Sequence, residues 1–162
     1  MKPRPGWLVL GAAAALASCS YFTLDFSKPM SSREIALEQE IRLFYAQVQT
    51  AFAAGNAEAL TDLFFPSITH PMTHEEIRAW SRGFFERNGR ARFHIQSFNI
   101  DKLSYVNPVV TVKYRVETPS GKDDFGAVET DTLAQLNGRW YIASWDSQPQ
   151  PASPVPNELG KQ

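Results

Sequence analysis

The chain has 162 residues, 43% of them hydrophobic and 12% aromatic, which is enough for one packed core and unlike an intrinsically disordered protein. Its 16 basic and 17 acidic residues give a formal net charge of −1, which excludes the strongly basic surface of a typical nucleic-acid-binding protein. The single cysteine excludes an internal disulfide, so the stability of the fold must come from packing.

The first 18 residues have the composition of an export signal. Lys2 and Arg4 are positively charged, and an apolar stretch of about ten residues follows between Trp7 and Leu16. This stretch is too short to span a bilayer, which requires about 20 helical residues. The sequence therefore predicts a signal peptide over residues 1–18.

The end of this segment, Leu16-Ala17-Ser18-Cys19, resembles the lipobox of bacterial lipoproteins. In that family the chain is cut before the cysteine, whose thiol and new amino group are acylated, and several acyl chains anchor a protein firmly. The resemblance implies lipidation of Cys19, attachment to a membrane, and a periplasm-facing place in the cell envelope. In lipoproteins of enteric bacteria, an aspartate directly after the cysteine resembles an inner-membrane retention signal. This chain has Ser20 at that position. The resemblance therefore favours the outer membrane. An ordinary signal peptide with a chance cysteine is the alternative.

A tether is expected over residues 19–31, where Ser, Thr, Lys and Pro29 dominate without a sustained period. Ser31 and Glu34 then have the spacing of a capping box, which marks a helix start. One apolar stripe follows at three- and four-residue steps: Leu37, Ile41, Phe44, Tyr45, Val48 and Phe52. Gly55 is expected to end this helix.

Two further helices are predicted. Asn56 can cap a short helix carrying Leu60, Leu63 and Phe64, which Pro66 is expected to stop. Thr73 and Glu76 form a second capping box. The helix that it begins runs to Gly89 and turns Ile77, Trp80 and Phe84 inward.

After Gly89 the hydrophobic period becomes alternating, which predicts strands over residues 91–105, 109–117, 125–136 and 139–146. The alternation switches parity within the first strand, which indicates a β-bulge or a bend. Asn137-Gly138 predicts a two-residue hairpin turn. Residues 147–162 are rich in proline, and we expect an extended or disordered tail there.

This order of elements, with the segments Gly55–Phe64 and Leu136–Trp145, resembles the superfamily of nuclear transport factor 2, ketosteroid isomerase and SnoaL-like cyclases. The resemblance implies an α+β fold of the cystatin-like cone type over residues 32–146, with three N-terminal helices packed in a curved antiparallel sheet of about four strands. The superfamily contains isomerases, dehydratases, hydrolases, scaffolds and pure binders. Function must therefore be argued from the site.

The isomerase pattern of that superfamily matches poorly. Its oxyanion-stabilising tyrosine falls on Val48 here, and Tyr45, one turn earlier, is expected to be a poor substitute. Its general-base aspartate before a proline corresponds best to His70-Pro71. A histidine can act as a base near neutral pH. The alternative is that His70 only closes the mouth of the cone.

The last hairpin offers a second candidate site. A two-residue turn predicts that Asp131 pairs with Ser144, and that Glu129 and Asp131 share the face of Trp140, while Trp145 lies on the other face. If the first face packs toward the helices, the two carboxylates point toward the open end of a cavity and could perform acid–base chemistry. The alternative is a surface pair neutralised by Lys113 and Arg115.

We expect any ligand pocket in the cone to be lined by five aromatic residues: Tyr45, Trp80, Phe84, Tyr114 and Trp140. No metal site is expected, because Pro71 interrupts the helix that would align His70 and His74, and His94 and Glu75 do not complete a pattern. No Gly-x-Ser-x-Gly motif and no phosphate-binding glycine loop is present, so no nucleophilic enzyme and no cofactor is predicted.

One basic cluster, Arg78, Arg82, Arg87, Arg90 and Arg92, is diluted by Glu75, Glu76 and Glu86. It is either the solvated side of the third helix or a contact for an anionic envelope partner.

Two hypotheses of function follow. The first is a non-catalytic, lipid-anchored envelope protein that binds a small apolar ligand in the cone, or docks a protein partner or a second copy through the sheet face, with no nucleic-acid partner. The rival is an isomerase- or dehydratase-type enzyme using His70 with Glu129 and Asp131.

Overall fold

Three helices precede four strands in the computed structural model, which describes residues 29–150. The predicted signal peptide, Cys19, most of the predicted tether and residues 151–162 lie outside the described residues. No helix within the described range is both long and apolar enough to cross a membrane.

Helix α1 (Ser32–Ala54) begins and ends as its sequence predicts. Ser31 and Glu34 form the capping box, with each side chain bonded to the backbone of the other. Gly55 ends the helix in the left-handed conformation at φ 64°, and its N–H reaches the carbonyl of Phe52 at 3.0 Å. Helix α3 (His74–Asn88) likewise starts with the predicted capping box of Thr73 and Glu76.

Helix α2 (Ala57–Thr61) starts at Asn56 as expected but is shorter than predicted. The expectation that it reaches Phe64 and is stopped by Pro66 is wrong. The chain leaves the helix because its backbone bonds to β4 instead: Ile142 N–H donates to the Leu63 carbonyl, and Phe65 N–H donates to the Ile142 carbonyl, both at 2.9 Å. These bonds attach the helical layer to the last strand.

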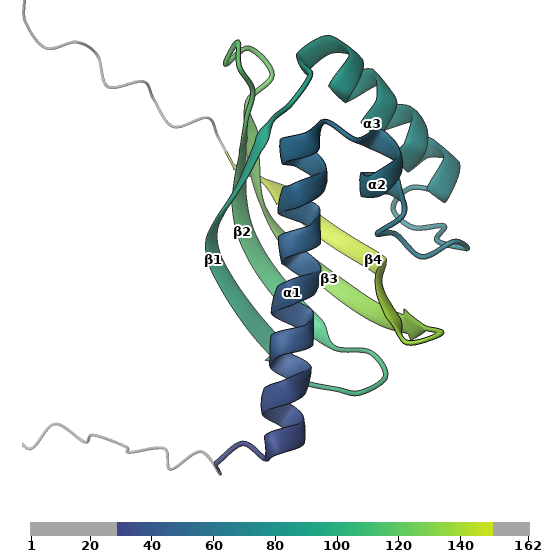
Figure 1. Ribbon diagram of the computed structural model, residues 1–162, viewed down its shortest axis with the longest axis vertical. Coiled ribbons are helices and arrows are strands. Elements are labelled where there is room, and N and C mark those ends of the chain that lie inside the picture. The colour runs from purple at the N-terminus through teal and green to yellow at the C-terminus, as the bar shows by residue number, and fades with distance from the viewer. Residues whose placement is uncertain (1–28, 151–162) are drawn as a thin grey trace, which may run out of the picture.

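The strands are β1 (Arg92–Lys102), β2 (Val109–Glu117), β3 (Phe125–Leu136) and β4 (Arg139–Pro149). They form one antiparallel sheet in the order β1-β2-β3-β4, which confirms the α+β prediction. Figure 1 shows the sheet curving around α1, with α2 and α3 beside the same face. The helices therefore cover the concave face of the sheet.

Register shifts bend the sheet in three places. Two in β1, between Ile95 and Ser97 and between Ile100 and Lys102, confirm the predicted irregularity. The third, between Thr132 and Leu133, was not predicted, and it makes Ala143 an extra residue in β4. Asp131 therefore pairs with Trp145 rather than with Ser144, and the expectation that Trp145 lies on the opposite face is wrong.

Strand β4 also runs to Pro149, so the predicted start of the tail at residue 147 is too early. Residues 147–149 stay in the sheet because β3 supplies partners for them, and Gln150 N–H donates to the Gly126 carbonyl at 2.8 Å.

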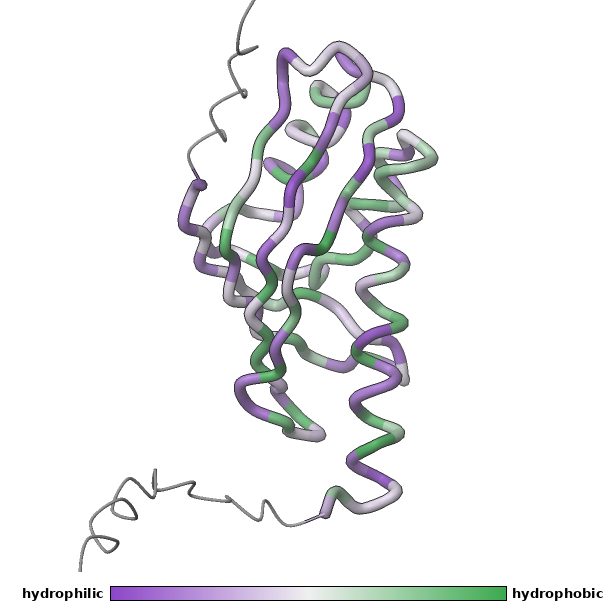
Figure 2. The backbone as a smooth tube through the Cα atoms, turned by 90° about the vertical axis from the view of Figure 1, so that its left-hand side faces the viewer, coloured by the Kyte–Doolittle hydropathy of each residue, from purple (hydrophilic) through white to green (hydrophobic). Residues whose placement is uncertain are grey.

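The core lies between α1 and the concave face of the sheet. Ile41, Val110, Val116 and Leu133 are fully buried there. Figure 2 shows hydrophobic and hydrophilic segments alternating along the strands, as expected for a sheet with one covered face. The burial of β2 alternates residue by residue in the same way. The covered, concave face of the sheet can therefore line a cavity together with the helices.

Candidate ligand-binding pocket

A cavity of about 200 Å³ lies between the helices and the concave face of the sheet. Seventeen side chains line it, and eight of them are aromatic: Tyr45, Phe52, Phe64, Trp80, Phe93, Tyr114, Phe125 and Trp145. The other members are aliphatic apart from Met72, Ser147 and two carboxyl groups. A mostly apolar wall with a few convergent polar groups is the usual character of a small-molecule site.

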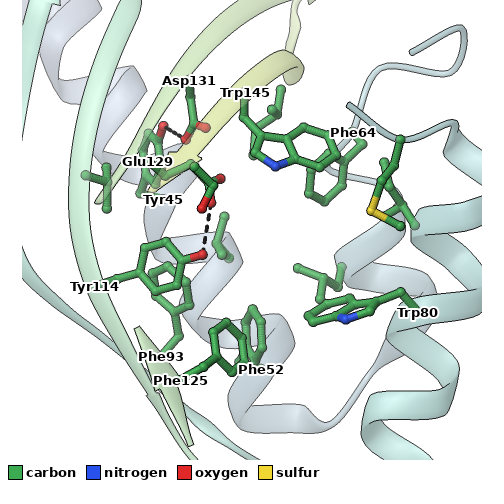
Figure 3. A pocket seen from close by; sticks show the side chains of 17 residues that line it. Tyr45, Phe52, Phe64, Trp80, Phe93, Tyr114, Phe125, Glu129, Asp131 and Trp145 are labelled. Carbon is green, nitrogen blue, oxygen red and sulfur yellow. Dashed lines mark hydrogen bonds between the residues drawn. The ribbon is translucent and has the colours of Figure 1, made fainter. Parts of the chain in front are cut away.

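The two carboxyl groups belong to Glu129 and Asp131, which lie two residues apart on β3 and so point to the same side of the sheet. Each accepts a hydrogen bond from a tyrosine (Figure 3). Tyr45 on α1 donates to Asp131 Oδ2 at 2.5 Å, and Tyr114 on β2 donates to Glu129 Oε2 at 2.9 Å. The site thus joins residues of one helix and two strands.

Burial controls the protonation of this group of four. It raises the pKa of Asp131 well above its ordinary value, and the nearby Glu129 raises it further. Burial also raises the pKa of Glu129, against the opposing effect of hydrogen bonds from Asp131 and Tyr114. The phenols of Tyr45 and Tyr114 have raised pKa values for the same reason, so both remain protonated donors.

Asp131 is the most deeply buried polar residue of the pocket, with 2% of its surface exposed. Its Oδ2 is bonded to Tyr45, but its buried Oδ1 accepts no hydrogen bond from the part of the chain that the structure describes. Buried polar atoms nearly always have a partner. An unpaired oxygen in the lining of a cavity is a position that a ligand donor can satisfy.

Three of the five predicted pocket residues, Tyr45, Trp80 and Tyr114, line this cavity, but Phe84 and Trp140 do not. Phe84 packs against the rings of Phe52 and Phe85 and belongs to the core. Trp140 lies beside the hairpin turn, where its indole N–H donates to Glu40 Oε2 at 3.2 Å. Both side chains are buried between the helices and the sheet, as predicted, but the cavity occupies only part of that space.

The alternative of a surface carboxylate pair is wrong, because Asp131 is buried and neither expected partner reaches it. Arg115 lies instead within 3.7 Å of Asp124 and 3.9 Å of Glu117. Lys113 pairs with Val128, the neighbour of Glu129 on β3, so Lys113 and Glu129 lie on opposite faces of the sheet.

The structure does not bring His70 to the carboxyl pair. His70 is exposed in the loop between α2 and α3, joined to Pro71 by a cis peptide bond, and it is not among the lining residues. Among residues 29–150, no three side chains of the His, Cys, Asp or Glu type gather as metal ligands would.

Three of the five arginines of the basic cluster form ion pairs within the described part of the chain. Arg78 and Arg82 both contact Glu58, at 3.6 and 2.5 Å, and Arg87 lies 3.8 Å from Asp123. These exposed pairs favour the solvated-side interpretation of the cluster.

Sequence reasoning missed two features of the site. Tyr45 is predicted as a pocket residue, but the sequence does not predict that its phenol donates to Asp131. Trp145 was placed on the outer face, but the extra residue Ala143 turns it inward. The only sequence signal for the second was an aromatic residue at the end of a strand, which does not reveal a bulge.

The sequence matches no known protein-family profile and no curated protein. Its fold is similar to several solved structures. A protein of unknown function with a cystatin-like fold from Nostoc punctiforme is 17% identical with a TM-score of 0.58, over 72% of this chain and 93% of that one. A structure from Novosphingobium aromaticivorans whose name suggests a scytalone dehydratase is 14% identical with a TM-score of 0.59, over 75% and 89%.

The protein Bd1075 of Bdellovibrio bacteriovorus is 14% identical with a TM-score of 0.63 over 75% of this chain, which spans less than half (45%) of its length. At these identities the similarity shows the fold alone. The cystatin-like fold expected from the resemblance is thereby confirmed.

Proposed function

We propose that this chain is a lipid-anchored protein of the bacterial cell envelope that binds one small, mostly apolar ligand in the pocket and does not transform it. The observation that carries the proposal is the aromatic cavity of about 200 Å³ with the buried Asp131 and the half-buried Glu129 on one side. The anchor rests on the lipobox-like segment before Cys19.

The size of the cavity limits the ligand to about one ring. An apolar cavity of about 150 Å³ accommodates benzene, whereas pockets for drug-sized ligands occupy about 300–1,000 Å³. The pocket meets solvent beside Trp80, which is 42% exposed, and beside Ser147, which is also exposed. A small molecule can therefore enter between α3 and the end of β4 without opening the core.

A second candidate function is acid–base catalysis of the isomerase or dehydratase type by Glu129 and Asp131 without His70. The raised pKa values of both carboxyl groups favour it, because one protonated and one ionised carboxyl can serve as acid and base. Tyr45 and Tyr114 would then hold the two groups in place.

Calorimetric titration with toluene and benzyl alcohol tests the binding function. We expect saturable one-to-one binding of at least one compound to the full-length chain. Val48 is buried and lines the cavity. The larger side chain of the variant Val48→Phe should fill the cavity and abolish binding. The matched control is Val106→Phe, at a position 70% exposed in the β1–β2 loop, which should bind normally. Equal binding by both variants would contradict the assignment of this pocket.

The catalytic candidate is tested with 3-cyclohexenone, a single-ring ketone whose isomerisation to the conjugated 2-cyclohexenone is followed by ultraviolet absorbance. The reaction only moves a proton, from the carbon beside the carbonyl to the far alkene carbon. Turnover above buffer that is lost in Asp131→Asn and Glu129→Gln would establish the enzyme and overturn the non-catalytic proposal. Binding of the ketone without turnover supports a binding protein.

A further inference from the structure

The charge in the pocket is one-sided. Glu129 and Asp131 line it, and none of the seventeen lining residues is lysine, arginine or histidine. Apart from the hydrogen bond between the two carboxyl groups themselves, their donors are the neutral phenols of Tyr45 and Tyr114. A buried carboxyl group is normally either neutralised by a proton or paired with a cation when ionised. Here no lining residue supplies one, so the place of a cation is open to a ligand.

The pocket also presents an unused hydrogen-bond acceptor. Asp131 Oδ1 is buried and accepts no hydrogen bond from residues 29–150, while Oδ2 of the same group is bonded to Tyr45. The only other hydrogen bond of this carboxyl group within that range is the one that it shares with the carboxyl group of Glu129. A ligand that donates an N–H at this point would remove the cost of the unpaired atom. A charged donor would do so more strongly, because charge-assisted hydrogen bonds are about twice as strong as neutral ones.

The opposite side of the cavity is aromatic. Figure 3 shows Glu129 and Tyr114 projecting from the sheet on one side and Trp80 projecting from α3 on the other, with Trp145 and Phe64 beside the same space. Indole and phenol rings attract cations through their faces, and aromatic cages of this kind recognise ammonium ligands. The aromatic rings and the carboxyl groups therefore both favour a positively charged ligand.

We propose that the ligand is a small organic amine whose cationic nitrogen is held by the carboxyl groups of Glu129 and Asp131, with an apolar body of about one ring against Trp80 and Trp145. This inference rests on the proposed binding function and deepens it. It assigns the two carboxyl groups to ligand recognition.

Three probes of one size but different headgroups test the inference on the full-length chain: benzylamine, benzyl alcohol and toluene. Calorimetry should show benzylamine binding about ten-fold or more tightly than benzyl alcohol, as expected for one charge-assisted hydrogen bond in a desolvated site. Benzyltrimethylammonium, which is cationic but has no N–H, should bind more weakly than benzylamine, because it cannot donate to Asp131 Oδ1.

Two conservative variants identify the cause of the preference. Asp131→Asn and Glu129→Gln should each reduce the ratio of benzylamine to benzyl alcohol affinity several-fold. The control Asp146→Asn, at an exposed position of β4, should leave the ratio unchanged. Circular dichroism establishes which variants are folded. If one variant does not fold, the ratio of benzylamine to benzyl alcohol affinity in the unmodified chain still tests whether the pocket prefers an amine.

The outcomes separate the two proposals. If benzyl alcohol or toluene binds as tightly as benzylamine, the amine inference is overturned while the binding function stands. If none of the three binds, both are overturned. A benzylamine preference that survives in both carboxyl variants would overturn the assignment to Glu129 and Asp131.

Discussion

The phenol of Tyr45 on α1 donates a hydrogen bond of 2.5 Å to Asp131 on β3, a residue 86 positions later in the chain. Both side chains are buried, with 3% and 2% of their surfaces exposed. The bond connects the helical layer to the sheet at the polar side of the pocket. It also supplies Asp131 with a buried hydrogen-bond donor from outside the sheet, so the stability of the fold and the shape of the site depend on the same contact.

Tyr45→Phe is therefore expected to lower the free energy of unfolding by about 1–3 kcal/mol, because Oδ2 of Asp131 would lose its donor while Oδ1 already has none. Urea denaturation followed by circular dichroism measures the change. Tyr105→Phe is the matched control, since Tyr105 is 51% exposed and should tolerate the loss of its hydroxyl. Equal effects of the two substitutions would show that the buried bond contributes nothing.

The buried carboxyl groups give the stability a defined pH dependence. Because burial raises the pKa of Asp131 in the folded state, the folded chain binds the proton more tightly than the unfolded chain. Stability associated with this group is therefore present below the unfolded pKa of about 3.8 and is lost as the pH rises toward the folded pKa. Glu129 acts in the same direction, and the Tyr45 and Tyr114 phenols that face the pair stay neutral.

Asp131→Asn should consequently gain stability relative to the unmodified chain as the pH rises from about 4 to 7, by at most about 1.4 kcal/mol per pH unit for one proton. Asp124→Asn is a control whose stability difference from the unmodified chain should not change with pH over this range. A hydrogen bond from the Thr118 backbone N–H lowers the pKa of Asp124, so the contribution of Asp124 to stability is fully present above its unfolded pKa of 3.8 and is lost only as the pH falls below that value. Urea midpoints measured across this pH range would refute the assignment if Asp131→Asn behaved like Asp124→Asn.

Two tryptophans allow the roles of the pocket and the core to be tested separately. Trp80 lines the cavity and is 42% exposed, whereas Trp140 is 7% exposed and bonds to Glu40 outside it. Trp80→Leu should weaken benzylamine binding by about 0.5–2 kcal/mol through loss of the aromatic face, with little change in stability. Trp140→Leu should destabilise the fold and leave binding intact. Calorimetry measures the binding and urea denaturation the stability of both variants. Normal binding by Trp80→Leu together with weakened binding by Trp140→Leu would refute the assignment of Trp80 to the pocket.

Gly126 is a point where the chain allows no side chain. A Cβ there would lie 2.8 Å from the carbonyl oxygen of Tyr114, a backbone atom that cannot move without shifting β2. Gly126→Ala should cost about 1–3 kcal/mol. Gly83→Ala is the control, because a Cβ in α3 would meet only the end of the Arg87 side chain at 3.3 Å. That helical substitution should stabilise by about 0.5–1 kcal/mol. Similar melting temperatures for the two variants would argue against the close approach.

The proposed anchor is tested by Cys19→Ala. We expect the unmodified protein to fractionate with membranes of the producing bacterium and to carry acyl groups on Cys19 detectable by mass spectrometry. The Cys19→Ala variant should leave the membrane fraction. An uncleaved chain with an unmodified Cys19 would show instead that the segment is not a lipobox.

The sequence by itself determined the local elements of this protein. The capping boxes at Ser31 and Thr73, the glycine at 55 and the change of hydrophobic period after Gly89 act over one or two turns of chain, and the structure has helices and strands where they predict them. Glu129 and Asp131 could also be placed on one face together, because a strand alternates strictly over two residues.

Only the tertiary structure decided which side chains meet in the pocket. The bulge at Ala143 arises from the pairing of β3 with β4, and it reverses the face of Trp145 in a way that the alternation of one strand cannot show. The contact of Tyr45 with Asp131 depends on how α1 crosses a curved sheet, and the burial of Asp131 that raises its pKa follows from that crossing. Local sequence patterns fix the elements because they act between neighbours, whereas the site depends on register and curvature between segments far apart in the chain.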